Sequence, residues 1–137
     1  MSDSDLDRVS AALDQLLAEH PPASCSDIEF RGHRYDAGLA WVHFPEGAGG
    51  MGVRPELNRL VEQRLREAGA KPTDPRTFFM ALAGPTIATH GSEEVKQRFL
   101  RPMFTGEERW CQLFSEPGAG SDLAGLATRA EIGRAHV

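Results

Sequence analysis

The sequence has few cysteines and no long apolar run. Only Cys25 and Cys111 are present among the 137 residues, and their separation matches no metal-ligand spacing. We therefore expect reduced thiols, as in a cytoplasmic protein. The longest apolar runs, such as 78–83, are far too short to cross a bilayer. The N-terminus has neither the basic nor the apolar region of a signal peptide, so no membrane association is predicted.

An excess of basic charge is also lacking. The net charge is −5, and the basic residues are scattered, which argues against a nucleic-acid partner. The five histidines show no metal-ligand spacing, and no Ser-His-Asp or Cys-His arrangement is recognisable, so we predict no metal and no catalytic residue. With 26% charged and 40% hydrophobic residues, the composition is typical of a globular protein with one core.

Helical periodicity dominates the first three quarters of the chain. Four segments carry apolar residues three and four apart, as amphipathic helices do: 5–20, 55–68, 74–90 and 92–106. We expect Gly84–Pro85 to break or kink the third helix. Residues 23–34 are interpreted as a surface connection. Residues 36–44 form either a short buried helix or an extended segment.

The pattern changes at Trp110. Residues 110–114 are rich in aromatic and apolar side chains and predict a strand, and 127–131 predict a second one. The expected fold is therefore mainly α. It has a helical bundle domain over 1–106, followed by the first strands of an incomplete β domain over 107–131.

Residues 47–52 match G-x-G-x-x-G by spacing. A dinucleotide site also needs a following helix packed in a βαβ unit and an acidic residue ending its second strand. Here the next helix opens only at Pro55, and a loop and further helices follow it. A glycine-rich connection between helices is the favoured interpretation.

The segment 115–122 reads SEPGAGSD and combines two hydroxyls, two carboxylates and two glycines. No lysine follows, so it is not a Walker A loop. Its backbone N–H groups suit an anionic or polar cofactor edge, and a tight turn between strands is the equal alternative. We expect Glu116 and Asp122 to order the loop rather than to react.

The segments that flank this loop show which known family it resembles. Gly84-Pro-Thr-Ile, then 90–107 (HGSEEVKQRFLRPMFTGE), then 112–122 (QLFSEPGAGSD) closely resemble the acyl-CoA dehydrogenase family. Upstream, 35–41 and 45–52 are similar to the N-terminal region of the same family. The resemblance covers roughly residues 35 to 131.

The resemblance implies a flavoprotein with a helical domain, a middle β-barrel domain and a C-terminal helical bundle. Members oxidise the Cα–Cβ bond of an acyl-CoA thioester to the 2-enoyl-CoA. A glutamate base removes the α proton, FAD accepts the β hydride, and an electron-transferring flavoprotein usually reoxidises the flavin. Exclusion of water protects the reduced cofactor.

Site residues follow by matching the family's motif. Gln112, Leu113, Phe114 and Ser115 match the strand edge along the flavin ring. Gly120 and Ser121 match the turn beside the FAD phosphates and the pantetheine arm of the substrate, so Ser121 is expected to touch both ligands. Gln112 and Phe114 sit where many members carry other residues, which weakens those two assignments.

The chain also departs from the family at its end. Residues 131–137 (EIGRAHV) resemble the translation of a sequencing-adapter oligonucleotide, so we expect 132–137 to be a non-native tail. The prediction is an inactive fragment of an oligomeric parent enzyme that carries the catalytic base further on. Alternatives are a non-enzymatic helical interaction module, an acyl-CoA oxidase or a flavin monooxygenase of the same superfamily.

Overall fold

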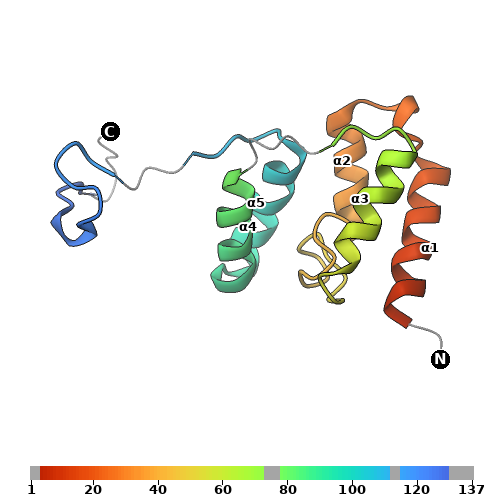
Figure 1. Ribbon diagram of the computed structural model, residues 1–137, viewed down its shortest axis with the longest axis horizontal. Coiled ribbons are helices and arrows are strands. Elements are labelled where there is room, and N and C mark those ends of the chain that lie inside the picture. The colour runs from red at the N-terminus through yellow and green to blue at the C-terminus, as the bar shows by residue number, and fades with distance from the viewer. Residues whose placement is uncertain (1–3, 73–77, 112–114, 130–137) are drawn as a thin grey trace.

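A computed structural model of the protein describes residues 4–72, 78–111 and 115–129. Its elements, in chain order, are α1 (Ser4–Glu19), the 3₁₀ turn η1 (Pro22–Ser24), α2 (Asp27–Asp36), α3 (Leu57–Glu67), α4 (Phe78–His90), α5 (Glu93–Thr105) and the 3₁₀ turn η3 (Leu123–Gly125). The first three helices lie together, and α4 and α5 form a hairpin beside them (Figure 1). α1 packs against α3, and α5 packs against both α2 and α4. None of the helices described is long and apolar enough to span a membrane.

Local capping signals set several helix ends. Ser26 and Glu29 form a capping box at the start of α2, in which each side chain binds the other residue's backbone N–H. Ser92 caps α5 by accepting from the Val95 N–H. Gly106, with φ of 87°, ends α5 in the left-handed conformation that only glycine adopts without strain.

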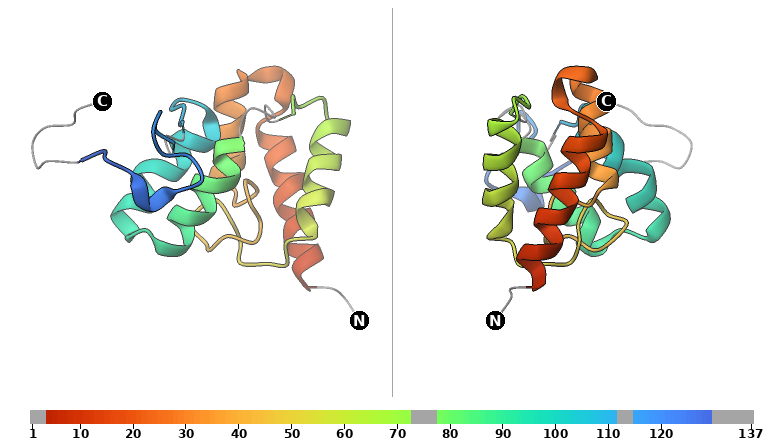
Figure 2. Two further views of the ribbon diagram at one scale, coloured as in Figure 1. Left: turned by 60° about the vertical axis from the view of Figure 1, so that its left-hand side comes forward. Right: turned by 90° about the vertical axis from the view of Figure 1, so that its right-hand side faces the viewer.

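Two apolar clusters form the core, and the segment between α2 and α3 contributes to both. The first cluster joins α1, α2 and α3, and it contains Leu39 and Val42 from that segment. The second joins the end of α2 to α4 and α5, and it contains Ala40, Phe44 and Ala48. Figure 2 shows this irregular segment running from below α2 to the lower end of α3. Neighbouring side chains of this segment are buried in different clusters. This packing holds its backbone in place although the segment has no regular secondary structure.

The structure corrects the prediction that 23–34 is a surface connection, because α2 begins at Asp27. The Ser-x-x-Glu spacing of Ser26 and Glu29 is the sequence signal of this helix start. Residues 37–44, whose conformation the sequence left open, form turns rather than a helix or a strand. Their apolar side chains are nevertheless buried.

Of the two outcomes expected at Gly84–Pro85, a break or a kink of the third helix, the break does not occur. α4 runs without interruption from Phe78 to His90 with Pro85 inside it. A proline removes one intrahelical hydrogen bond, whereas the packing of Ala83, Ile87 and Ala88 in the second cluster retains the helix on both sides of it. The Thr86 hydroxyl adds a hydrogen bond of 2.8 Å to the Leu82 carbonyl.

The predicted strands are not confirmed. Within the described residues there is no strand, only the isolated bridges Glu46–Gly50 and Glu116–Ala119. Residues 110–111 and 127–129 are irregular, and the rest of both predicted strands lies outside the described residues. The incomplete β domain and the tail at 132–137 therefore stay predictions.

Candidate functional site

The loop over 115–129 is built around a tight turn. The Glu116 N–H donates to the Ala119 carbonyl at 2.9 Å, and the Ala119 N–H donates back to the Glu116 carbonyl at 3.1 Å. Pro117 and Gly118 occupy the two central positions of this turn, where their conformations suit the reversal. The tight turn is present, without flanking strands in the described residues, and the cofactor-binding edge stays a prediction.

The Glu116 carboxylate ties this turn to the residues that follow it. It accepts hydrogen bonds from the Ala127 N–H at 3.0 Å, from the Thr128 N–H at 2.6 Å and from the Thr128 hydroxyl. These bonds, led by the one from Ala127, lower the pKa of Glu116 because they stabilise the charged form. Glu116 therefore holds the turn against residues 127–128, and its carboxylate is occupied by these hydrogen bonds within the loop.

The remaining polar groups of the loop face outward. Ser115, Gly120 and Ser121 are all exposed. A Cβ placed on Gly118 or Gly120 would meet nothing within 4 Å, so the backbone here is open to close approach by a ligand. The other expected flavin contacts, Gln112, Leu113 and Phe114, lie outside the described residues. Two hydroxyls and bare backbone on a braced turn make a surface that can hydrogen-bond a polar ligand.

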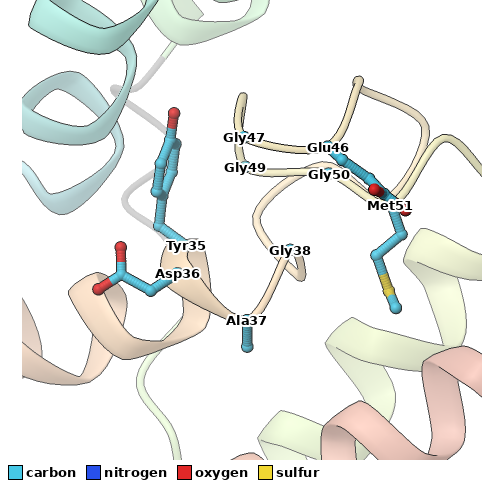
Figure 3. A pocket seen from close by; sticks show the side chains of 9 residues that line it. All are labelled: Tyr35, Asp36, Ala37, Gly38, Glu46, Gly47, Gly49, Gly50 and Met51. Carbon is cyan, nitrogen blue, oxygen red and sulfur yellow. The ribbon is translucent and has the colours of Figure 1, made fainter.

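A second feature is a cavity of about 400 Å³ between the end of α2 and the glycine-rich loop (Figure 3). Tyr35 and Asp36 line one side, and Gly47 and Gly49 form part of the other. The Tyr35 ring packs so closely on Gly49 that a Cβ there would lie 2.6 Å from the ring. The loop connects α2 to α3, and no strand occurs in the fully described stretch 37–56. The geometry therefore favours the helix connection over a dinucleotide fingerprint.

Both acidic groups at this cavity are already paired. Asp36 binds Arg101 of α5, and Glu46 binds Arg8 of α1 at 3.1 Å. The hydrogen bond from Arg101 is the main cause that lowers the pKa of Asp36. Burial, together with the nearby Asp36 charge, raises the pKa of Tyr35 to about 12. The two acidic groups of this cavity thus form ion pairs that connect α2 to α5 and the glycine-rich loop to α1.

Arg34 is a buried charge that sequence reasoning missed. It is 5% exposed, its Nε donates to the Leu39 carbonyl at 2.8 Å, and its Nη2 pairs with Glu62 of α3. Its guanidinium also lies 5.3 Å from the centre of the Phe104 ring. This one side chain thus connects α2, the buried segment, α3 and α5. Within the described residues, no group of three or more His, Cys, Asp or Glu could hold a metal.

The described residues thus form packed helices, α1 to α5, followed along the chain by an exposed polar loop at 115–129. Residues 15–107 match the family described as acyl-CoA dehydrogenase, N-terminal domain. The match covers more than half of the chain, so the chain belongs to the acyl-CoA dehydrogenase family.

Named relatives agree with this assignment. The chain is 46% identical over 95 residues to acyl-CoA dehydrogenase FadE34 of Mycobacterium tuberculosis, covering 69% of this chain and 13% of that protein. It is 40% identical over 96 residues to acyl-CoA dehydrogenase IpdE1 of the same organism, covering 70% and 25%. It is also 40% identical over 50 residues, covering 36% and 13%, to subunit CarC of the caffeyl-CoA reductase–Etf complex of Acetobacterium woodii.

The chain thus spans a quarter or less of the length of these relatives. No solved structure matches it.

Proposed function

We propose that this chain is the N-terminal part of an FAD-dependent acyl-CoA dehydrogenase, which oxidises the Cα–Cβ bond of an acyl-CoA thioester to the 2-enoyl-CoA. The observation that carries the proposal is the family match over 15–107, followed directly by the exposed polar loop at 115–129. The names of the relatives support oxidation of an acyl-CoA.

The described residues of the loop offer the groups that a flavin cofactor can hydrogen-bond. Its exposed hydroxyls and its open backbone at Gly120 offer hydrogen-bond partners without a side chain in the way. We assign Phe114 and Ser115 to the pyrimidine portion of the flavin, and Gln112 and Leu113 to the edge along the flavin ring. Gly120 and Ser121 are assigned to the FAD phosphates, and Ser121 also to the pantetheine arm of the substrate.

These assignments give the cofactor and the residues of this chain different roles. Bound FAD supplies the acceptor for the β hydride. The residues of this chain hold and orient the two ligands, and Glu116 keeps the loop in shape through its bonds to Ala127 and Thr128. No residue of this chain is assigned as catalytic. The glutamate base belongs to the C-terminal bundle of the parent enzyme, so the 137-residue chain alone is expected to be inactive.

An electron-transferring flavoprotein is the proposed electron acceptor of the parent. The support is the relative from Acetobacterium woodii, whose name places it in a complex with Etf. The parent is also proposed to be an oligomer and to work in the cytoplasm.

The test compares this chain with the whole gene product. The whole product is expected to carry flavin and to oxidise acyl-CoA, whereas the 137-residue chain shows neither. In the whole product, Ser121→Ala is expected to raise the KM for acyl-CoA about tenfold, as the loss of one hydrogen bond to a ligand does. Ser10→Ala on α1 removes a hydroxyl far along the chain from the loop and serves as the control. A whole product without flavin, or a flavin-loaded 137-residue chain that turns over acyl-CoA, contradicts the proposal.

A further inference from the structure

The residues that follow α5 are bound back onto that helix. Residues 106–110, here called the connector, lead from α5 toward the polar loop. The N–H groups of Gly106 and Glu108 both donate to the Pro102 carbonyl, at 3.2 and 3.1 Å. The Glu108 carboxylate pairs with the Arg98 guanidinium, with 2.6 Å between Oε1 and Nη1. Backbone and side-chain contacts together therefore hold the connector against α5.

Trp110 is the last residue of the connector, and it contacts α5 through its ring. The Trp110 and Phe99 rings meet edge to face, with centroids 5.3 Å apart and planes at 83°. Such a pair stabilises more than the apolar area that it buries. Trp110 is half-buried and also packs against the second apolar cluster. Arg98 and Phe99, which are adjacent in α5, thus hold Glu108 and Trp110 of the connector.

The polar loop lies a short distance further along the chain. Within its described residues, 115–129, its hydrogen bonds join one part of the loop to another. Trp110 comes two residues before Gln112 and five before Ser115, the first and the last of the residues assigned to the flavin ring. Five residues span at most about 18 Å. The position of Trp110 therefore restricts where the flavin-facing residues can lie relative to the helices.

We propose that Trp110 is a positioning residue for the flavin, because its contact with Phe99 fixes the start of the flavin-binding segment before the cofactor binds. A segment that is already held in place loses less conformational entropy on binding, so the affinity for the ligand is higher. Trp110 acts through the backbone that follows it, and no contact with the cofactor or the substrate is assigned to it. This inference rests on the proposed function, since it concerns the FAD of the parent enzyme.

The test is FAD binding to the apoprotein of the whole gene product, measured by the change in flavin fluorescence. Trp110→Ala is expected to raise the Kd for FAD about tenfold, as the loss of an aromatic pair and its buried area does. Trp110→Phe keeps an aromatic ring opposite Phe99 and is expected to restore the Kd to within about threefold of the native value. Leu6→Ala is the control, because it removes a partly exposed apolar side chain at the start of α1. It is expected to keep the native Kd.

A second variant removes the other ring of the pair. Phe99→Leu keeps an apolar side chain on α5, so it preserves more of the packing than alanine at position 110 does, and it is also expected to weaken FAD binding several-fold. A native Kd in Trp110→Ala or in Phe99→Leu overturns the inference, and so does a Trp110→Phe protein that is as weak as Trp110→Ala. These results leave the proposed function intact. A native whole product that binds no FAD overturns both.

Discussion

Arg101 of α5 donates two parallel hydrogen bonds to the carboxylate of Asp36 of α2. Nε donates to Oδ1 at 2.8 Å and Nη2 donates to Oδ2 at 2.9 Å. A flat guanidinium fork and a carboxylate match in this way, whereas a lysine offers one point of contact. The pair fastens the α4–α5 hairpin to the first three helices beside the second apolar cluster.

We expect Arg101→Lys to lower the free energy of unfolding by about 1 kcal/mol, since the pair is partly exposed and screened by water. The folded-state pKa of Asp36 is depressed, so its contribution is present above the ordinary aspartate pKa and is lost as the pH falls through the lowered value. Urea unfolding between about pH 7 and pH 3 measures this loss. Asp36→Asn removes the titrating group, so an undiminished acid slope in that variant would contradict the assignment.

Tyr35 gives a spectroscopic prediction because it is the one tyrosine in the sequence. With its pKa raised to about 12, roughly one tenth of it is ionised at about pH 11, against about nine tenths for a free phenol. Ultraviolet absorbance of tyrosinate measures this fraction. The folded state holds its proton longer than the unfolded chain, so this group makes stability fall as the pH rises above about 10. Asp36→Asn should lower the Tyr35 pKa.

Gly50 tests the close packing of the glycine-rich loop. A Cβ at this position would lie 2.1 Å from the Phe44 carbonyl oxygen and 2.5 Å from that of Trp41. Because backbone cannot move aside as a side chain does, we expect Gly50→Ala to cost about 3 kcal/mol of stability. Gly47→Ala is the control, since its Cβ meets nothing and only its φ of 82° opposes alanine, at about 1 kcal/mol. Equal losses in thermal or urea unfolding would show that contact is not the cause.

The hydrogen bonds of Glu116 to Ala127 and Thr128 can be tested by substitution. Its replacement by alanine removes the acceptor for the Ala127 and Thr128 N–H groups, so both amides should exchange with deuterium faster. Thr128→Val is the matched control, because it removes the hydroxyl bond but leaves both backbone bonds. Acidification below the lowered pKa of Glu116 should weaken the same bonds in the native chain. Unchanged exchange in Glu116→Ala contradicts the brace.

The predictable parts of this fold are those written in local sequence. The helices at 57–67 and 93–105 were expected within two residues of where they lie, because a flanking proline, a serine cap and terminal glycines mark their ends. α2 also carries such a signal in Ser26 and Glu29, but its residues show little of the apolar periodicity that marks the other helices. At Pro85 the packing of α4 outweighs the local tendency of proline to end a helix.

The polar loop could be predicted from its composition and from the resemblance of its flanks to the family. The partners of Glu116 could not be foreseen, because they lie eleven and twelve residues further along. Arg34 gave no sequence signal at all. An arginine in a helix is ordinarily solvated, and only three-dimensional packing shows that this one is buried.

The helices at 4–19, 57–67, 78–90 and 93–105 and the family could be predicted from the sequence alone. Periodicity, caps and motif residues act over a few positions along the chain, so one sequence is enough to read them. The remaining features depend on how the helices pack: the sorting of 37–53 into two clusters, the Asp36–Arg101 pair, the burial of Arg34 and the stack of His20 on His33. These contacts join residues that are brought together by the packing of helices, and no local pattern encodes that packing.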